Sequence, residues 1–151
     1  MKLLVLCKVR PRPVTTTWLK RFCSLALRTL KGAAFEKKAE LSVLLTGDGE
    51  MKRLNRAYRK KNRTTDVLSF SLLEGRNLRA GSKGTTPLGD VVISVPQAKR
   101  QAAAQKWALR NELSLLLAHG ILHLFGYDHV NRAGTKRMFA LQDRILRKWK
   151  A

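Results

Sequence analysis

"HGILHLFGYDH", residues 119–129, contains all three histidines of a chain of 151 residues. His119 and His123 are four residues apart, so on a helix both rings project from one face about one turn apart. Gly126 is well placed to end that helix in a left-handed conformation, and the chain can then turn back toward the same face. The spacing therefore predicts a helix whose end carries a cluster of His119, His123 and His129.

Three neutral imidazoles with a fourth coordination position left open are typical of a catalytic zinc site. The chain has no fourth histidine, and Cys7 and Cys23 lie far from the cluster in the sequence. We therefore expect the three histidines to bind one metal ion per chain. Zn²⁺ is the expected ion, although nickel and copper also suit histidine ligands.

The pattern H-x3-H-x2-G-x2-H matches the ligand spacing of the metzincin peptidases. Those enzymes carry a glutamate directly after the first histidine as general base, and this chain has Gly120 there. The missing carboxylate weakens a peptidase interpretation, which stays open as the weaker alternative.

Charge indicates the class of partner. Thirty-one Lys and Arg against ten Asp and Glu give a formal net charge of +21 and a sequence pI near 11.2. Such an excess attracts polyanions, so we expect a nucleic-acid partner. No apolar run approaches the roughly 20 residues of a membrane helix, and we expect neither a membrane partner nor a dinucleotide cofactor. Two cysteines in apolar contexts favour reduced thiols in a cytoplasmic protein.

Hydrophobic periodicity indicates an α+β fold. Strand patterns occupy residues 2–9, 40–46, 65–73 and 88–95. Helical patterns begin near Thr15, after "GDGE" at 47–50, at Pro96, near residue 108 and near residue 135. We predict one domain over residues 1–151, with a small mixed four-stranded sheet, about five helices and the metal site at the end of a central helix.

The histidine stretch also resembles the HGxLHLxGYDH signature of the YbeY family of endoribonucleases. Three further stretches match this family in the expected order: "LNRAYRKKNRTTDVLSF" at 54–70, "LGDVVIS" at 88–94 and "NEL" at 111–113. The resemblance implies an α+β, metal-dependent endoribonuclease specific for single-stranded RNA. It also implies roles in small-subunit rRNA maturation and ribosome quality control, with rRNA and the small ribosomal subunit as partners.

By motif position the resemblance makes His119, His123 and His129 the zinc ligands and Arg59 a functionally important arginine. Its planar guanidinium can bind two phosphate oxygens, so we expect Arg59, His119 and His123 to be catalytic. We expect backbone phosphate contacts from the basic residues around it, namely Lys52, Arg53, Arg56, Lys60, Lys61 and Arg63. Either a zinc-activated water or the ribose 2′-hydroxyl can attack, and the sequence leaves that choice open.

Several other residues have simpler expected roles. Asp128 can orient a histidine or stabilise a turn. Asp66 and Asp90 are expected to start strands with structural hydrogen bonds, and Glu112 to favour a helix start rather than bind the ion. The aromatic residues at helical spacing are expected to pack in the core, namely Trp18, Phe22, Trp107 and Trp149. A noncatalytic RNA- or ribosome-binding protein with a metal-stabilised fold also stays open.

Overall fold

The computed structural model describes residues 1–59, 65–73 and 84–150. In these residues the strands are β1 (Lys2–Cys7), β2 (Ala39–Thr46), β3 (Val67–Ser71) and β4 (Thr86–Ser94). The helices are α1 (Thr16–Lys31), α2 (Ala33–Lys38), α3 (Asp48–Arg59), α4 (Val95–Gln105), α5 (Leu109–Leu124) and α6 (Arg132–Lys150).

The four strands form one sheet in the order β1-β2-β4-β3. β1 pairs with β2 and β2 with β4 in parallel, whereas β3 pairs with β4 in the antiparallel sense. Parallel neighbours need a crossover, and the α1–α2 segment supplies the one between β1 and β2. The predicted α+β class with a mixed four-stranded sheet is therefore confirmed.

Most predicted helix ends are where the sequence signals put them. The Thr15 hydroxyl accepts a hydrogen bond from the Trp18 N–H at 3.0 Å, and Gly32 follows the last residue of α1 with φ +88°. Ser94 caps α4 in the same way, accepting from the Gln97 N–H at 3.3 Å. α2 was not predicted. It is a six-residue helix with no side-chain cap at its start, so it leaves little local signal.

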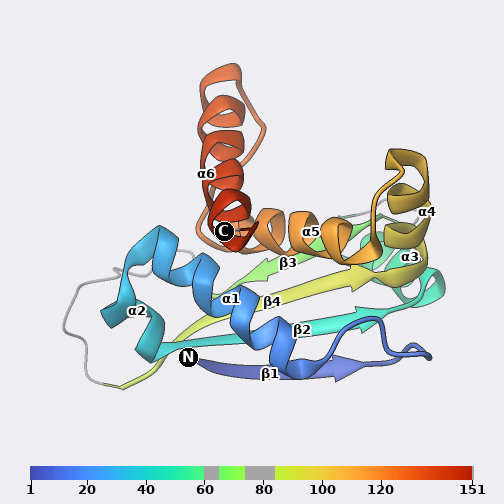
Figure 1. The fold of residues 1–151 in the computed structure, drawn as a ribbon, viewed down its shortest axis with the longest axis horizontal. Coiled ribbons are helices and arrows are strands. Elements are labelled where there is room, and N and C mark those ends of the chain that lie inside the picture. The colour runs from blue at the N-terminus through green and yellow to red at the C-terminus, as the bar shows by residue number, and fades with distance from the viewer. Residues whose placement is uncertain (60–64, 74–83, 151) are drawn as a thin grey trace.

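α1 and α5 lie over one face of the sheet, and α6 stands against both helices (Figure 1). The main core lies between these layers and includes Phe22, Leu45, Ile93 and Ile121, all fully buried. An aromatic cluster holds α6 to α1. The Trp149 ring lies edge-on to the rings of Trp18 and Phe22, with centroids 5.6 and 5.1 Å away. The expected packing roles of these three aromatic residues are thus confirmed. The same expectation is wrong for Trp107, which is 36% exposed and is not part of the core.

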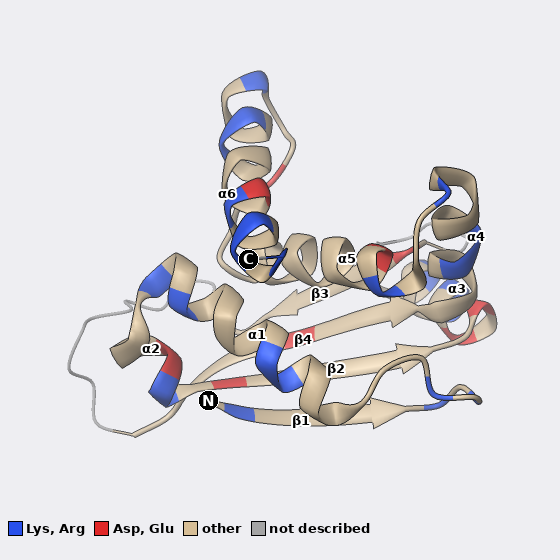
Figure 2. Ribbon diagram, viewed as in Figure 1, with Lys and Arg blue, Asp and Glu red and all other residues tan. Residues whose placement is uncertain are grey.

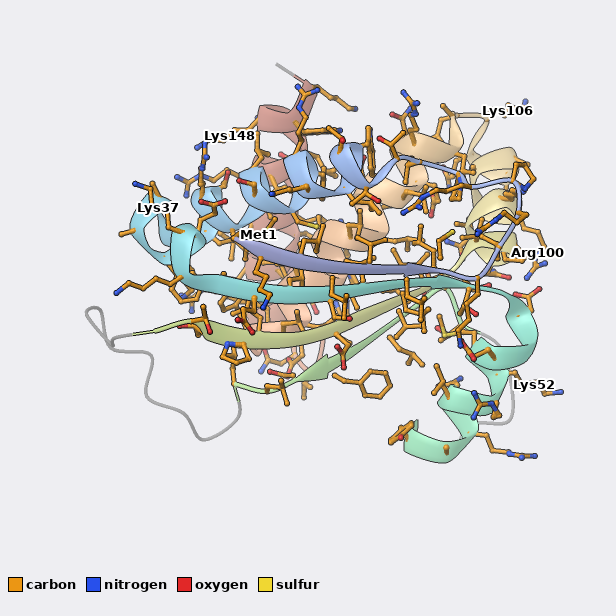
Figure 3. All side chains as sticks on the ribbon, turned by 90° about the horizontal axis from the view of Figure 1, so that it is seen from below. Met1, Lys37, Lys52, Arg100, Lys106 and Lys148 are labelled. Atoms are coloured by element: carbon orange, nitrogen blue, oxygen red, sulfur yellow. The ribbon has the colours of Figure 1, made fainter. Side chains whose placement is uncertain are left out.

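α3 covers one end of the opposite face of the sheet (Figure 3). Met51 packs there on Leu68 and Val92 in a smaller buried cluster. The Asp48 carboxylate, in the first turn of α3, accepts hydrogen bonds from the Ser94 hydroxyl at 2.8 Å and from Arg100 at 2.9 Å. These contacts fix the helix that ends at Arg59.

α5 approaches β3 and β4 so closely that residue 120 has no room for a side chain. A Cβ on Gly120 would lie 2.7 Å from Val91 Cγ1 and 3.2 Å from Val67 Cγ2. Two β3 hydroxyls donate to helix carbonyls, Ser69 to that of Gly120 at 2.8 Å and Ser71 to that of Leu124 at 2.7 Å. Gly120 thus has a packing role that its place in the motif alone did not indicate.

Replacing Gly120 by Ala should destabilise the fold by about 1–3 kcal/mol, because the added methyl group overlaps Val91. Urea unfolding followed by circular dichroism measures this. Gly49→Ala is the matched control, since a Cβ on Gly49, also helical, meets nothing within 4 Å. Equal midpoints for Gly120→Ala and the parent protein would contradict a close contact at this position.

Candidate metal centre

The end of α5 is built as the glycine at 126 suggested. Gly126 has φ +90°, and its N–H donates to the His123 carbonyl at 3.0 Å. The Tyr127 N–H donates to the Leu122 carbonyl at 3.2 Å. This pair of hydrogen bonds is a Schellman motif, in which a left-handed residue ends the helix and reverses the chain. The reversal directs His129 back toward α5.

The imidazole rings of His119, His123 and His129 lie close together at the end of α5. His119 Nε2 lies 3.0 Å from His123 Nε2 and 3.2 Å from His129 Nε2. In a tetrahedral site with Zn–N bonds of about 2.0–2.1 Å, two nitrogen ligands lie about 3.3–3.4 Å apart. The observed spacing is close to that value, so the donor set fits one zinc-sized ion. His119, His123 and His129 could therefore hold a metal at the end of the central helix, as predicted.

The environment of His119 favours the neutral ring that metal binding needs. Burial lowers the pKa of His119 from its ordinary value near 6.5, and the neighbouring His129 lowers that pKa further. The hydrogen bond to Gln142 and the charge of Asp66 oppose this but do not reverse it. The net lowering of its pKa favours the neutral form of His119, which is the form that can act as a ligand.

Gln142 is a part of the site that the sequence pattern did not reveal. It is buried on α6, and its Oε1 lies 3.2 Å from His119 Nδ1. An amide oxygen only accepts hydrogen bonds, so this contact favours the tautomer in which Nδ1 carries the proton. One sequence signal existed: Gln142 is a polar residue on the helical face that Met138 and Ile145 share, and both are buried.

Asp128 and Asp66 each accept a hydrogen bond from a backbone N–H group. Asp128 Oδ1 accepts from the Val130 N–H at 3.1 Å, which is the turn-stabilising role considered for it. Asp66 precedes β3, and its Oδ1 accepts from the Val67 N–H at 2.7 Å. Asp90 lies within β4 and not at its start, because that strand begins at Thr86.

Glu112 is buried in the first turn of α5 and holds neighbouring elements together. Its two oxygens accept hydrogen bonds from Gln101 Nε2 at 2.8 Å and from Trp107 Nε1 at 2.9 Å. Gln101 Nε2 also donates to Asp66 at 3.2 Å. The carboxylate is therefore engaged away from the histidine cluster, as expected for a residue that is not a ligand.

The basic residues predicted to contact RNA are only partly described. α3 ends at Arg59, whose side chain lies outside the described part, as do Lys60, Lys61 and Arg63. Lys52, Arg53 and Arg56 are exposed on α3, and Arg53 pairs with Glu50 at 3.2 Å. Lys and Arg also gather along α1 and α6 (Figure 2). Among the described helices, none is long and apolar enough to span a membrane.

The chain is similar to one known protein family and to several of its curated members. The family model described as Endoribonuclease YbeY matches residues 8–150. The endoribonuclease YbeY of Dehalococcoides mccartyi strain BAV1 is 43% identical over 138 residues, covering 86% of this chain and 84% of that protein. The Staphylococcus carnosus protein of that name is 39% identical over 133 residues, covering 88% and 87%.

The endoribonuclease YbeY of Myxococcus xanthus is 44% identical over 131 residues. That match covers 87% of this chain and only 41% of the longer Myxococcus protein.

Among solved structures, the solution structure of TM1509 from Thermotoga maritima aligns with a TM-score of 0.59 at 22% identity. The alignment covers 98% of this chain and 91% of that one, so the fold is shared along nearly the whole length. The family model and the relatives agree with the motif carried by residues 119–129. On these grounds the chain belongs to the endoribonuclease YbeY family.

Proposed function

We propose that residues 1–151 act as one zinc-dependent endoribonuclease unit that cleaves phosphodiester bonds in single-stranded RNA. The proposed setting is maturation of small-subunit rRNA and ribosome quality control in the cytoplasm, with the small ribosomal subunit as partner. The convergence of three histidine Nε2 atoms, in a family whose curated relatives are named endoribonucleases, carries the proposal. The net charge of +21 supports an RNA substrate.

His119, His123 and His129 are the proposed ligands of the ion. When bound, Zn²⁺ supplies a positive charge that polarises a phosphoryl oxygen and lowers the pKa of water. The protein contributes imidazole nitrogens that already lie close together. His119 comes from the rigid helix α5, and burial keeps its pKa below the ordinary value.

Gln142 is the proposed positioning residue for His119. Its Oε1 accepts the Nδ1 proton, which leaves the lone pair of a neutral His119 on Nε2, facing His123 and His129. The same hydrogen bond fixes the plane of the ring. His119 is thus held in the tautomer that a metal ligand requires.

The position of Gly120 argues against the peptidase alternative. A metzincin peptidase needs a glutamate side chain at this position. Here a side chain would meet Val91 and Val67 of the sheet. A general base is therefore not supplied from residue 120. RNA cleavage would tolerate its absence better than amide hydrolysis, because RNA itself carries a 2′-hydroxyl that can act as the nucleophile.

Arg59 is proposed to grip the phosphate at the cleaved bond, and Arg56, Lys60, Lys61 and Arg63 to contact neighbouring phosphates. A guanidinium can donate two parallel hydrogen bonds to phosphate oxygens, which a single ammonium group cannot reproduce. The support for this proposal is the place of Arg59 in the stretch at residues 54–70 that resembles the family.

Removing the metal tests the function directly. Zinc-loaded protein should cleave single-stranded RNA, lose this activity with excess chelator and regain it on adding Zn²⁺.

His119→Ala and His123→Ala should abolish cleavage, with Arg144→Ala on the exposed side of α6 as the control variant. Mapping the product ends identifies the attacking group. Binding of RNA without any metal-dependent cleavage would favour the noncatalytic alternative, and cleavage of casein the peptidase.

Substituting Gln142 by Leu should weaken zinc binding about 10- to 100-fold, because the tautomer and ring orientation of His119 are no longer fixed. Gln142→Glu should retain the affinity, since a carboxylate also accepts the Nδ1 proton. Competition with a chromophoric chelator measures both, and Arg144→Leu controls for changes on α6. Unchanged zinc affinity in Gln142→Leu would remove Gln142 from the site.

Exchanging Arg59 for Lys keeps the charge and removes the paired hydrogen bonds. We expect cleavage to slow by roughly tenfold or more, the equivalent of one charged hydrogen bond. Arg56→Lys, one turn earlier on the same helix, should change the rate much less. Similar rates for both variants would show that Arg59 acts only through its charge.

A further inference from the structure

An exposed aromatic ring lies beside the histidine cluster. Phe139, on α6, is 50% exposed, whereas the neighbouring Met138 is fully buried. The Phe139 ring centroid lies 5.6 Å from that of His129, at an interplanar angle of 43°. His129 Nε2 in turn lies 3.2 Å from His119 Nε2. The His129 side chain therefore lies between the exposed ring and the proposed position of the ion.

The backbone that presents this ring is well fixed. The Schellman motif at Gly126 sets the start of the turn between α5 and α6. Asp128 then accepts from the Val130 N–H, and Asn131 Oδ1 caps α6 by accepting from the Gly134 N–H at 2.7 Å. Phe139 lies two turns into that capped helix. Hydrogen bonds thus stabilise both the turn and the helix that carry the Phe139 ring.

The half of α6 that carries the ring is cationic. Arg132, Lys136 and Arg137 are exposed on the N-terminal half of α6, and the first acid of this helix is Asp143. The Arg137 guanidinium lies 5.7 Å from the centre of the Tyr127 ring. Figure 2 shows these basic positions along α6. An exposed aromatic ring next to the histidine cluster, on a helix segment with three exposed cations, matches a ligand that is planar at one end and anionic at the other.

We propose that Phe139 is a nucleobase platform, on which one unpaired base of the RNA stacks while an adjacent phosphate lies at the histidine cluster. This rests on the proposed function and adds a subsite to it. Unpaired bases stack on aromatic side chains, whereas bases inside a duplex have both faces covered. The platform would therefore select single-stranded RNA at the point of cleavage, with little preference among bases.

Fluorescence anisotropy of labelled eight-nucleotide probes tests the platform, using the full chain freed of metal so that cleavage does not deplete them. Oligoadenylate carries bases and phosphates, and an abasic oligomer of equal length carries phosphates alone. Phe139→Ala should weaken oligoadenylate binding about 5- to 100-fold and leave abasic binding unchanged. Phe139→Trp should restore the base-dependent affinity. Leu4→Ala, which alters a 69% exposed residue of β1, is the matched surface control and should bind like the parent.

Zinc affinity separates base stacking on Phe139 from mere support of His129 by the ring. Cleavage separates the platform from the proposed function. Zinc affinity should be the same in Phe139→Ala and the parent; a parallel loss would show that the ring only supports His129, which overturns the proposal. Base-independent binding by the parent also overturns it, even if cleavage is normal. Base-dependent binding that Phe139→Ala removes, in a chain that never cleaves RNA, would support the platform and contradict the proposed function instead.

Discussion

The close approach of α5 to strands β3 and β4 at Gly120 is the constraint on which the site depends. Helix and sheet meet there without an intervening side chain, and Ser69 and Ser71 bond to carbonyls of the same helix. Leu124 is in the last turn of α5, where carbonyls lack helical partners, so the Ser71 hydroxyl satisfies one that would otherwise be lost. This contact fixes the position of α5 and therefore of His119 and His123. Gly126 then reverses the chain so that His129 lies beside them.

Much of the fold could be predicted because its signals are local. Thr15 and Gly32 mark the ends of α1, Pro96 marks the first turn of α4, and the observed strands lie at the predicted places with ends shifted by about two residues. α2 escaped prediction, since six residues without a cap differ little from a loop in sequence. Strand order was not predicted, because pairing depends on contacts between distant segments.

The histidine cluster could be predicted for the same reason, since its three members lie within eleven residues and at one helix end. Gln142 could not be placed beside His119, since it is 23 residues away and its role depends on how α6 packs. Gly120 was identified from the motif but understood only in part. Its sequence context showed the missing carboxylate, and only the packing showed that Val91 and Val67 occupy the space. The spacing of residues in the sequence therefore predicts the candidate ligands more readily than the residues that orient and pack around them.

The contact between Gln142 and His119 makes the docking of α6 and the binding of an ion thermodynamically linked. If the three histidines bind an ion, whatever favours the docked helix would raise their affinity for it, and the ion would stabilise docking by the same free energy. Trp149, packed on Phe22 at the far end of α6, contributes to docking without touching the site. An apolar aromatic cluster away from the histidines would thereby influence the concentration at which a metal ion occupies them.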